Sequence, residues 1–141
     1  MTVAYMLDAD VCIHLVRRRS PPLAERFLRP GQALAVSTIV QTELLVGVAK
    51  SPDPHKAAER VEALLGRVVI LPFDEDAAAH AADVRAGLER AGTKIGAYDG
   101  LIAGHARRVG AVLVTGNVRE FSRVPGLRTD DWLAEAGDRS Q

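Results

Sequence analysis

Short apolar runs alternate along this chain with longer segments in which apolar and polar residues recur at helical spacing. Four runs show no polar alternation, which is typical of strands buried on both faces, and they lie at residues 3–7, 33–36, 68–71 and 112–114. Helical patterns separate them, at residues 11–18, 23–28, 38–49, 54–65, 75–91 and 97–109. A short fifth strand is expected at residues 127–129, and a helical turn around Trp132 follows it.

Capping residues mark most of the expected helix boundaries. Asp10 is assigned as the N-cap of the first helix, and Ser37 or Thr38 as that of the third. Asp74 opens the long Ala-rich helix, and Gly110 ends the helix before the fourth strand. Taken alone, residues 115–121 are interpreted as an ordinary turn rich in small polar residues.

Alternating strands and helices predict an α/β fold, a three-layer α/β/α sandwich with a mostly parallel sheet of about five strands flanked by helices. The length of 141 residues fits a single domain, expected at residues 1–136, with a frayed tail at 137–141. Ligands of such sheets bind beyond the carboxyl ends of the strands. The candidate functional positions therefore follow the strands, at Asp8, Asp10, Ser37, Phe73, Asp74 and residues 115–117.

Composition narrows the possible classes of protein. Cys12 is the only cysteine, which excludes an internal disulfide and a multi-cysteine zinc site and favours a reducing compartment, the cytoplasm. No apolar run approaches the ~20 residues that cross a bilayer, so no membrane association is expected. Basic and acidic residues balance at 18 each, which argues against a general polyanion binder but permits a local basic patch.

Three carboxylates occupy positions for which a structural role is hard to supply. Asp8 directly follows the first strand, where the structural alternative is a turn former. Glu43 belongs to a helix that is apolar nearly all round, so we expect it to be buried beside Ile39 and Val46. Burying an ion costs several kcal/mol unless it is paired. The alternative for Glu43 is a solvated edge position or a salt bridge to an arginine.

Asp99 repeats this anomaly. It begins the apolar stripe of its helix that continues with Ile102, Ala103 and Ala106. The alternative interpretation is helix capping, because a carboxylate near a helix N-terminus also gains from the helix dipole.

A divalent cation would reconcile these acids at one edge of the sheet. Carboxylates brought together repel one another, and a hard cation such as Mg²⁺ removes that conflict with oxygen ligands and retained waters. Asp8, Glu43 and Asp99, with Asn117 or Glu120 as an auxiliary group, thus suit metal-assisted hydrolysis of a phosphodiester. Thr115 and Asn117 add groups that hydrogen-bond phosphate or a metal-bound water.

At these residues the sequence resembles a PIN domain, in particular a VapC-type ribonuclease toxin of a VapBC toxin–antitoxin system. The matching segments span nearly the whole chain in order: YMLDADV at 5–11, STIVQTELLVG at 37–47, IGAYDGLIAGHA at 95–106, LVTGNVREF at 113–121, VPGL at 124–127 and DW at 131–132. The first segment departs from the more frequent Asp-Thr-Asn of the family, because Ala9 lacks the hydroxyl and Asp10 adds a charge.

The resemblance implies a PIN-like five-stranded sheet and an endoribonuclease that depends on Mg²⁺ or Mn²⁺. Asp8, Glu43 and Asp99 match the family's three acids and would bind the metal, and Thr115 matches the conserved hydroxyl after the fourth strand. Many relatives carry Asp where Asn117 stands, so Asn117, Glu120 or a water fills that fourth place. The implied reaction is cleavage of structured RNA, commonly tRNA, by metal-activated water. The implied partners are a second copy of the chain, as a homodimer, and a VapB-type antitoxin.

Two other classes of protein remain alternatives. A haloacid-dehalogenase-like phosphatase would use Asp8 of the Asp8-Ala9-Asp10 motif as its nucleophile, but none of the three lysines directly follows a strand to meet the phosphate. A catalytically silent domain would use the same fold only to bind a partner. Arg17, Arg18 and Arg19 are interpreted as a solvated helix end, with contact to an RNA backbone as the alternative.

Overall fold

The structure is a computed structural model that describes residues 2–135 of the chain. Five strands form one sheet in the order β3-β2-β1-β4-β5, and all four neighbouring pairs are parallel. The strands are β1 (Tyr5–Leu7), β2 (Leu34–Ser37), β3 (Val69–Leu71), β4 (Val112–Val114) and β5 (Thr129–Asp130). The expected parallel sheet is therefore confirmed. The frayed tail expected at 137–141 lies outside the described residues.

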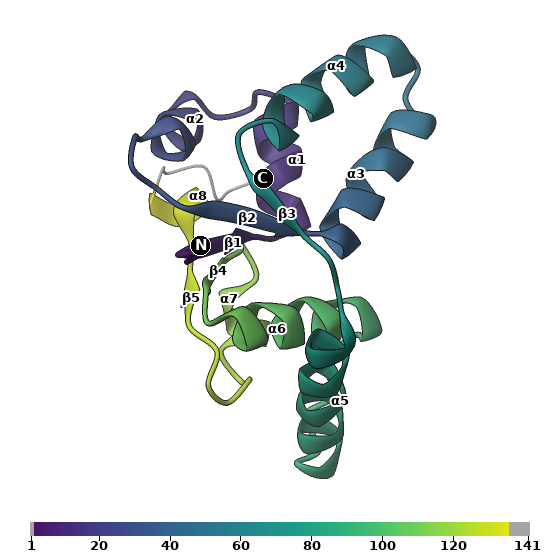
Figure 1. The fold of residues 1–141 in the computed structure, drawn as a ribbon, viewed down its shortest axis with the longest axis vertical. Helices are drawn as coiled ribbons and strands as arrows, with labels where there is room; N and C mark the ends of the chain where they lie inside the picture. Colours follow the sequence, from purple (N-terminus) through teal and green to yellow (C-terminus); the bar gives the residue numbers. More distant parts are fainter. Residues whose placement is uncertain (1, 136–141) are drawn as a thin grey trace.

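Helices cover both faces of this sheet (Figure 1). On one side lie α1 (Ala9–Val16), α2 (Pro21–Leu28), α3 (Thr38–Ala49) and α4 (Pro54–Leu65), and on the other α5 (Glu75–Arg90), α6 (Ala97–Val109) and α7 (Val118–Phe121). The last element is α8 (Trp132–Glu135), whose Trp132 is fully buried. The α3–α4 hairpin and the far end of α5 extend beyond the sheet (Figure 1).

The apolar runs form the strands because their side chains fill the space between the two helical layers. Met6, Leu7, Ala35, Val36 and Leu113 are fully buried, so the core consists largely of aliphatic side chains. This packing brings the carboxyl ends of β1 and β4 together, since Leu7 pairs with Val114 in the sheet. The segments that follow these two strands are therefore adjacent in space.

The structure corrects three local expectations. The N-cap of α1 is Asp8, whose carboxylate accepts a hydrogen bond of 2.8 Å from the Ala9 N–H, whereas Asp10 lies in the first helical turn. Residues 118–121 form the short helix α7 rather than a turn, and the last strand lies at Thr129–Asp130 rather than at 127–129. A four-residue helix and a two-residue strand are too short for a periodic pattern to indicate.

The expectation that α3 is buried nearly all round is also wrong. Val40 and Leu44 are buried, but Leu45 and Val46 are 51% and 44% exposed. The reason is that α3 extends past the sheet with α4, so that only one of its faces meets the core (Figure 1). Glu43 is exposed as a result. The burial argument that singled out Glu43 therefore does not hold.

Helices α5 and α6 cross in close contact within the layer that α5, α6 and α7 form on one face of the sheet. Gly104 of α6 is buried, and a Cβ atom at this position would lie 2.4 Å from both the backbone N and the Cα of Ala81 in α5. Backbone atoms cannot move aside as a flexible side chain can, so this contact requires glycine. The same helix carries Asp99 one and a half turns earlier, so the crossing also fixes the position of that acid.

We expect Gly104→Ala to lower the free energy of unfolding by at least ~2 kcal/mol, because the added methyl group must push α5 and α6 apart. Urea unfolding followed by circular dichroism measures this change. Gly87→Ala is the matched control, since Gly87 lies inside α5 with no atom closer than 4.0 Å to its added Cβ. The control should be neutral or stabilising by up to ~1 kcal/mol. Equal effects of the two substitutions would contradict the close packing.

Candidate active site

Asp8 anchors a group of polar side chains at the carboxyl end of β1 and β4. It is 6% exposed, and its Oδ2 atom accepts a hydrogen bond of 2.9 Å from the buried Thr115 hydroxyl. The same hydroxyl oxygen accepts a hydrogen bond of 3.0 Å from the Asn117 N–H. Thr115 thus joins the acid that follows β1 to the loop that follows β4.

Asp10 supports the same loop. Its Oδ2 atom accepts a hydrogen bond of 2.9 Å from the Gly116 N–H, and its Oδ1 atom accepts one of 2.8 Å from the Val11 N–H. A Cβ atom at Gly116 would lie 2.7 Å from Asp10 Oδ2, so the loop approaches this carboxylate as closely as glycine permits. Sequence reasoning assigned Asp10 to a helix cap and missed this tertiary contact.

Asp99 lies in the first turn of α6, partly exposed, on the side of the helix where Ile102, Ala103 and Ala106 are fully buried. The N-cap of α6 is Gly96, which has no side chain to cap the helix, and Asp99 forms no capping hydrogen bond to the helix backbone. A capping hydrogen bond therefore does not account for Asp99, although its place in the first turn is favourable in the helix dipole. Burial raises the pKa of Asp99 to about 6, with the charges of Glu120, Asp8 and Asp10 adding to the effect.

Glu120 connects α7 to the start of α6. Its carboxylate accepts hydrogen bonds from the Asn117 amide at 2.9 Å and from the Gly96 N–H at 3.4 Å. Partial burial raises the pKa of Glu120. The pKa is nevertheless lowered overall, by these two bonds, by a hydrogen bond from the Asp99 carboxyl and by the charge of Arg123. When the Asp99 carboxyl is protonated, it therefore donates a hydrogen bond to Glu120, whose carboxylate keeps its charge to lower pH.

Arg123 holds α7 and the loop before α6 together. Its guanidinium donates hydrogen bonds to the backbone oxygens of Thr93 at 2.9 Å and Lys94 at 3.1 Å, and Nη2 lies 3.9 Å from Glu120 Oε1. The loop that leads into α6 is thereby tied to α7. Asn117 and Glu120, the two residues considered for the fourth-acid position, bond to each other rather than competing for it.

The charge on Asp8 is opposed by its surroundings. Burial, together with the charges of the nearby Asp10 and Glu120 carboxylates, raises the pKa of Asp8 to about 6. The hydrogen bonds from Ala9 and Thr115 lower this pKa but do not offset the rise. The charge of Asp8 in turn raises the pKa of Asp99. A cluster in which negative charge is held against burial and repulsion is the environment that a divalent cation stabilises.

Glu43 lies outside this hydrogen-bonded cluster. It is exposed on α3, and no hydrogen bond or ion pair joins it to Asp8, Asp10, Asp99 or Glu120. Across residues 2–135, no three His, Cys, Asp or Glu side chains converge closely enough to enclose a metal ion. The donor set fits a cation held by one or two carboxylates and several waters, which is the usual coordination of Mg²⁺ in proteins.

Tyr98 is a second residue that sequence reasoning missed. Its hydroxyl is buried and has no hydrogen-bond partner among the described residues. Burial raises the pKa of Tyr98, and the charges of the Asp8, Glu43 and Asp99 carboxylates add to that effect. Its place directly before Asp99 was the available signal, but an aromatic residue at a helix start is equally typical of core packing.

His105, by contrast, belongs to the core. It is 2% exposed, its Nδ1 atom lies 2.8 Å from the Ser37 hydroxyl, and its ring meets the Phe73 ring edge-on. Burial lowers the pKa of His105, which favours the neutral ring. The bond ties β2 to α6, in agreement with a structural role.

The comparisons with known proteins agree with this fold. The family model of the PIN domain matches residues 5–127. The tRNA(fMet)-specific endonuclease VapC of Salmonella typhimurium is 41% identical over 128 residues, which cover 91% of this chain and 97% of that protein. Ribonuclease VapC2 of Haemophilus influenzae is 39% identical over 129 residues, which cover 92% and 98% of the two chains.

Solved structures show the same likeness in three dimensions. A chain of the DNA-bound VapBC crystal structure from Salmonella typhimurium matches with a TM-score of 0.86 and 40% identity, over 93% of this chain and 99% of that one. A chain of VapBC2 from Rickettsia felis, bound to a promoter DNA fragment, matches with a TM-score of 0.85 and 32% identity, over 92% and 99%.

The chain belongs to the PIN domain family and, within it, to the VapC group of ribonucleases. The resemblance expected from the sequence is thus confirmed, and the phosphatase alternative, which requires another family, is excluded. None of the helices within residues 2–135 combines the length and apolar character that crossing a bilayer requires.

The raised pKa of Asp8 predicts how the stability of the metal-free protein depends on pH. The pKa of about 6 in the folded chain exceeds the ordinary value of 3.8, so the folded state binds more protons between these values. Stability is therefore lost as pH rises from about 4 to 6 and stays lower above. Relative to the parent, Asp8→Asn should gain roughly 2 kcal/mol between pH 4 and pH 7.5, as urea unfolding in EDTA would measure.

Asp83→Asn is the control of opposite sign. A hydrogen bond from Arg107 lowers the pKa of the exposed Asp83, so its contribution to stability is present at neutral pH and is lost on acidification. This variant should lose stability relative to the parent as pH rises toward about 4, the ordinary range of a carboxyl group, and show almost no further change between pH 4 and pH 7.5. A pH dependence of Asp8→Asn that is flat, or that has the sign of Asp83→Asn, would contradict the description of the Asp8 environment.

Proposed function

We propose that this ribonuclease cuts structured RNA, specifically tRNA, in a reaction that depends on Mg²⁺ or Mn²⁺. The observation that carries the proposal is the pair of acids Asp8 and Asp99, because burial and the charges of neighbouring carboxylates raise the pKa of each to about 6. Such a pair is unfavourable unless it binds a cation. PIN-domain ribonucleases as a class depend on divalent metals, and these acids are the ones best placed to meet that need.

Each residue of the site has a part in this proposal. Asp8 and Asp99 would hold the cation, and Glu43 would contribute through water. Thr115 keeps the Asp8 carboxylate turned toward the site, and Glu120 does the same for Asp99. The bound cation supplies a Lewis acid that stabilises charge on a phosphoryl group and lowers the pKa of water.

The fourth-acid position is assigned to Glu120 rather than to Asn117. Asn117 is exposed and donates its amide to Glu120, whereas Glu120 reaches both Asp99 and Gly96. Glu120 therefore holds the negative charge at this place, and Asn117 orients it.

Hydrolysis by water would leave 5′-phosphate and 3′-hydroxyl ends, whereas attack by a ribose 2′-hydroxyl would leave a cyclic phosphate.

The relatives support the substrate and the partners. Two of them are named tRNA(fMet)-specific endonucleases and are 41% and 39% identical, which favours tRNA as the substrate here. Solved neighbours are VapBC complexes, which supports a cognate VapB-type antitoxin as partner of this chain. We further propose that the chain forms a homodimer and works in the cytoplasm, where tRNA is present.

Asp99→Asn is expected to reduce tRNA cleavage at least ~1000-fold, because it removes a charge that the cation needs, while the protein stays folded. Cleavage of a tRNA transcript in Mn²⁺ buffer, with sequencing of the product ends, measures both rate and chemistry. Asp76→Asn is the matched control on α5, where Asp76 pairs with Arg108 at 3.0 Å on the surface, and it should cut at the parental rate.

Unchanged cleavage by Asp99→Asn would contradict the proposed mechanism. Parental protein that fails to cut any RNA, with or without Mn²⁺, would instead favour the catalytically silent alternative. Cyclic phosphate ends would keep the ribonuclease activity but replace water as the attacking group.

A further inference from the structure

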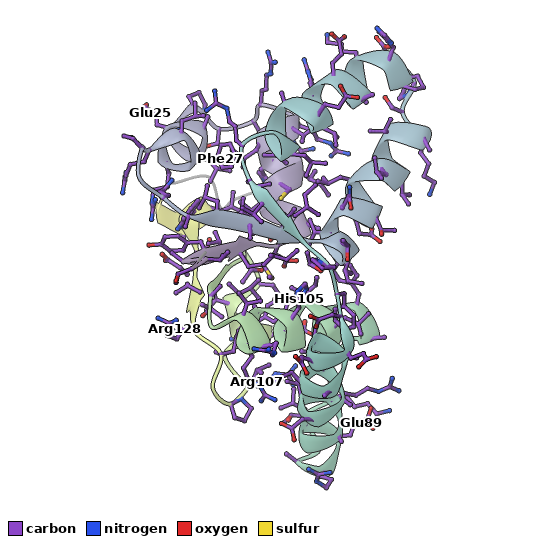
Figure 2. All side chains as sticks on the ribbon, in the orientation of Figure 1. Glu25, Phe27, Glu89, His105, Arg107 and Arg128 are labelled. Atoms are coloured by element: carbon purple, nitrogen blue, oxygen red, sulfur yellow. The ribbon has the colours of Figure 1, made fainter. Side chains whose placement is uncertain are left out.

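The basic side chains within residues 2–135 differ in whether they pair with a carboxylate, as Arg107 (Figure 2) does with Asp83. Arg85, Arg107, Arg108 and Arg123 each pair with a carboxylate, and all four lie on α5, on α6 or just after α7. Near the end of α1 and along the α3–α4 hairpin, the basic residues form no ion pair within residues 2–135, namely Arg17, Arg18, Arg19, Lys50, Lys56, Arg60 and Arg67. The charges of these side chains are therefore not neutralised by an ion pair among the described residues.

A cleft of about 500 Å³ runs between α1 and the α3–α4 hairpin, and we call it the α1–hairpin cleft. Its apolar floor includes Ile13, Leu44 and Val61, and four basic side chains line it, Arg17, Lys50, Lys56 and Arg60. Only two acids line the same cleft, Glu43 and Asp53, and Asp53 is engaged with the Lys56 N–H at the start of α4. The wall is thus basic except where Glu43 stands.

Helix α1 links the cleft to the acidic site. Glu43 lines the cleft and contributes to the electrostatic environment of Tyr98 together with Asp8 and Asp99. Helix α1 connects the two regions, because Asp8 caps its first turn and Arg17 caps its last. Eight helical residues span about 12 Å, so the cations stand a few nucleotides away from the acids.

We infer that the α1–hairpin cleft binds the sugar–phosphate backbone of the RNA strand next to the bond that is cut. The inference rests on the proposed function, because it takes RNA as the substrate. Lys and Arg side chains contact phosphates, and such contacts position a strand without reading its sequence. The acids of the site alone would repel RNA, which is a polyanion. Unpaired cations beside the site attract it.

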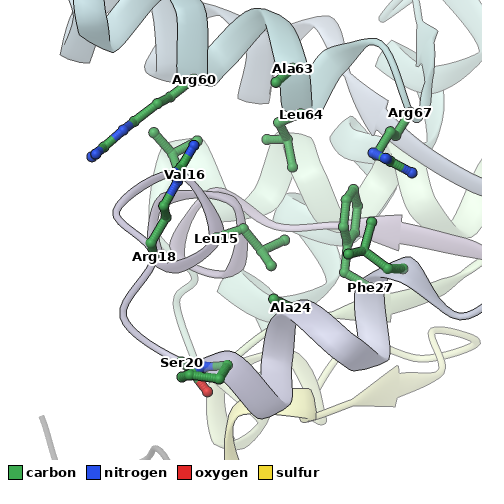
Figure 3. Close-up of a pocket in the computed structure, with 12 residues that line it drawn as sticks. Leu15, Val16, Arg18, Ser20, Ala24, Phe27, Arg60, Ala63, Leu64 and Arg67 are labelled. Atoms are coloured by element: carbon green, nitrogen blue, oxygen red, sulfur yellow. The ribbon is translucent and has the colours of Figure 1, made fainter.

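A neighbouring hollow of about 360 Å³ differs in character (Figure 3). It lies between α1, α2 and α4 over Leu15, Phe27 and Leu64, with Arg18 and Arg60 on one side and Arg67 on the other. It has no acid in its lining and does not reach Glu43. Nothing in the structure indicates what covers this hollow, so the inference is confined to the α1–hairpin cleft.

The test uses the full chain carrying Asp99→Asn, so that RNA is bound but not cut. The affinity for a fluorescein-labelled tRNA transcript is measured by anisotropy between 50 and 200 mM KCl. Adding Lys50→Ala and Lys56→Ala should weaken binding at least ~10-fold and reduce the salt slope by about 2, one for each lost phosphate contact. Both lysines are exposed, so the melting temperature should stay at the parental value.

The matched control removes two exposed cations elsewhere, with Arg29→Ala at the end of α2 and Arg90→Ala at the end of α5. This double variant should bind the transcript as the Asp99→Asn parent does. RNA affinity that is equal in the two double variants would overturn the inference and leave the proposed function standing. A parent that binds no RNA at all would overturn both.

A second probe separates RNA from an acidic protein segment. Poly-L-glutamate should bind the parent at least ~10-fold more weakly than the tRNA transcript under the same salt conditions. Lost polyglutamate affinity in the lysine double variant, combined with unchanged RNA affinity, would assign the cleft to an acidic partner protein and overturn the inference.

Discussion

Repulsion among carboxylates that are buried or partly buried is the constraint around which this structure is organised. Asp8, Asp10, Asp99 and Glu120 come from three separate segments of the chain, and the pKa values of Asp8 and Asp99 are raised to about 6. A protein without a use for such a cluster would disperse it, because each shift costs folding free energy at neutral pH. This fold instead holds the acids in place with Thr115, Gly116 and Arg123, so the cost of assembly is met before any cation binds.

The parallel sheet makes that assembly possible. Strands β1 and β4 are neighbours in register, so Asp8 and Thr115 meet at the same edge although they are far apart in sequence. The crossing at Gly104 and Ala81 then sets α6, and with it Asp99, against this edge. The net charge of zero hides the result, since acids gather at the sheet edge while unpaired cations line the α1–hairpin cleft beside it.

The fold and two of the acids were accessible from the sequence for identifiable reasons. Uninterrupted apolar runs indicate buried parallel strands, Asp8 ends such a run, and Asp99 begins an apolar stripe. Glu43 was selected on a burial argument that fails, because a helix can be apolar on every face and still extend past the core. Periodicity does not show where an element ends in space, which is a tertiary property.

The supporting residues were not accessible in the same way. Asp10 and Tyr98 act through contacts with segments distant in the chain, and Asp8 rather than Asp10 caps α1 although both are good capping residues. Helix α7, which presents Glu120, spans four residues and leaves no periodic trace. These features depend on how segments meet, so local patterns could not indicate them.

Proton release on cation binding tests the central claim most directly. Calorimetric titration of Mn²⁺ into the metal-free protein, in buffers of different ionisation enthalpy, counts the protons released. Because Asp8 and Asp99 have pKa values of about 6, binding should release on the order of one proton at pH 6 and almost none at pH 8. Absence of Mn²⁺ binding, or a proton count that is the same at both pH values, would contradict the account.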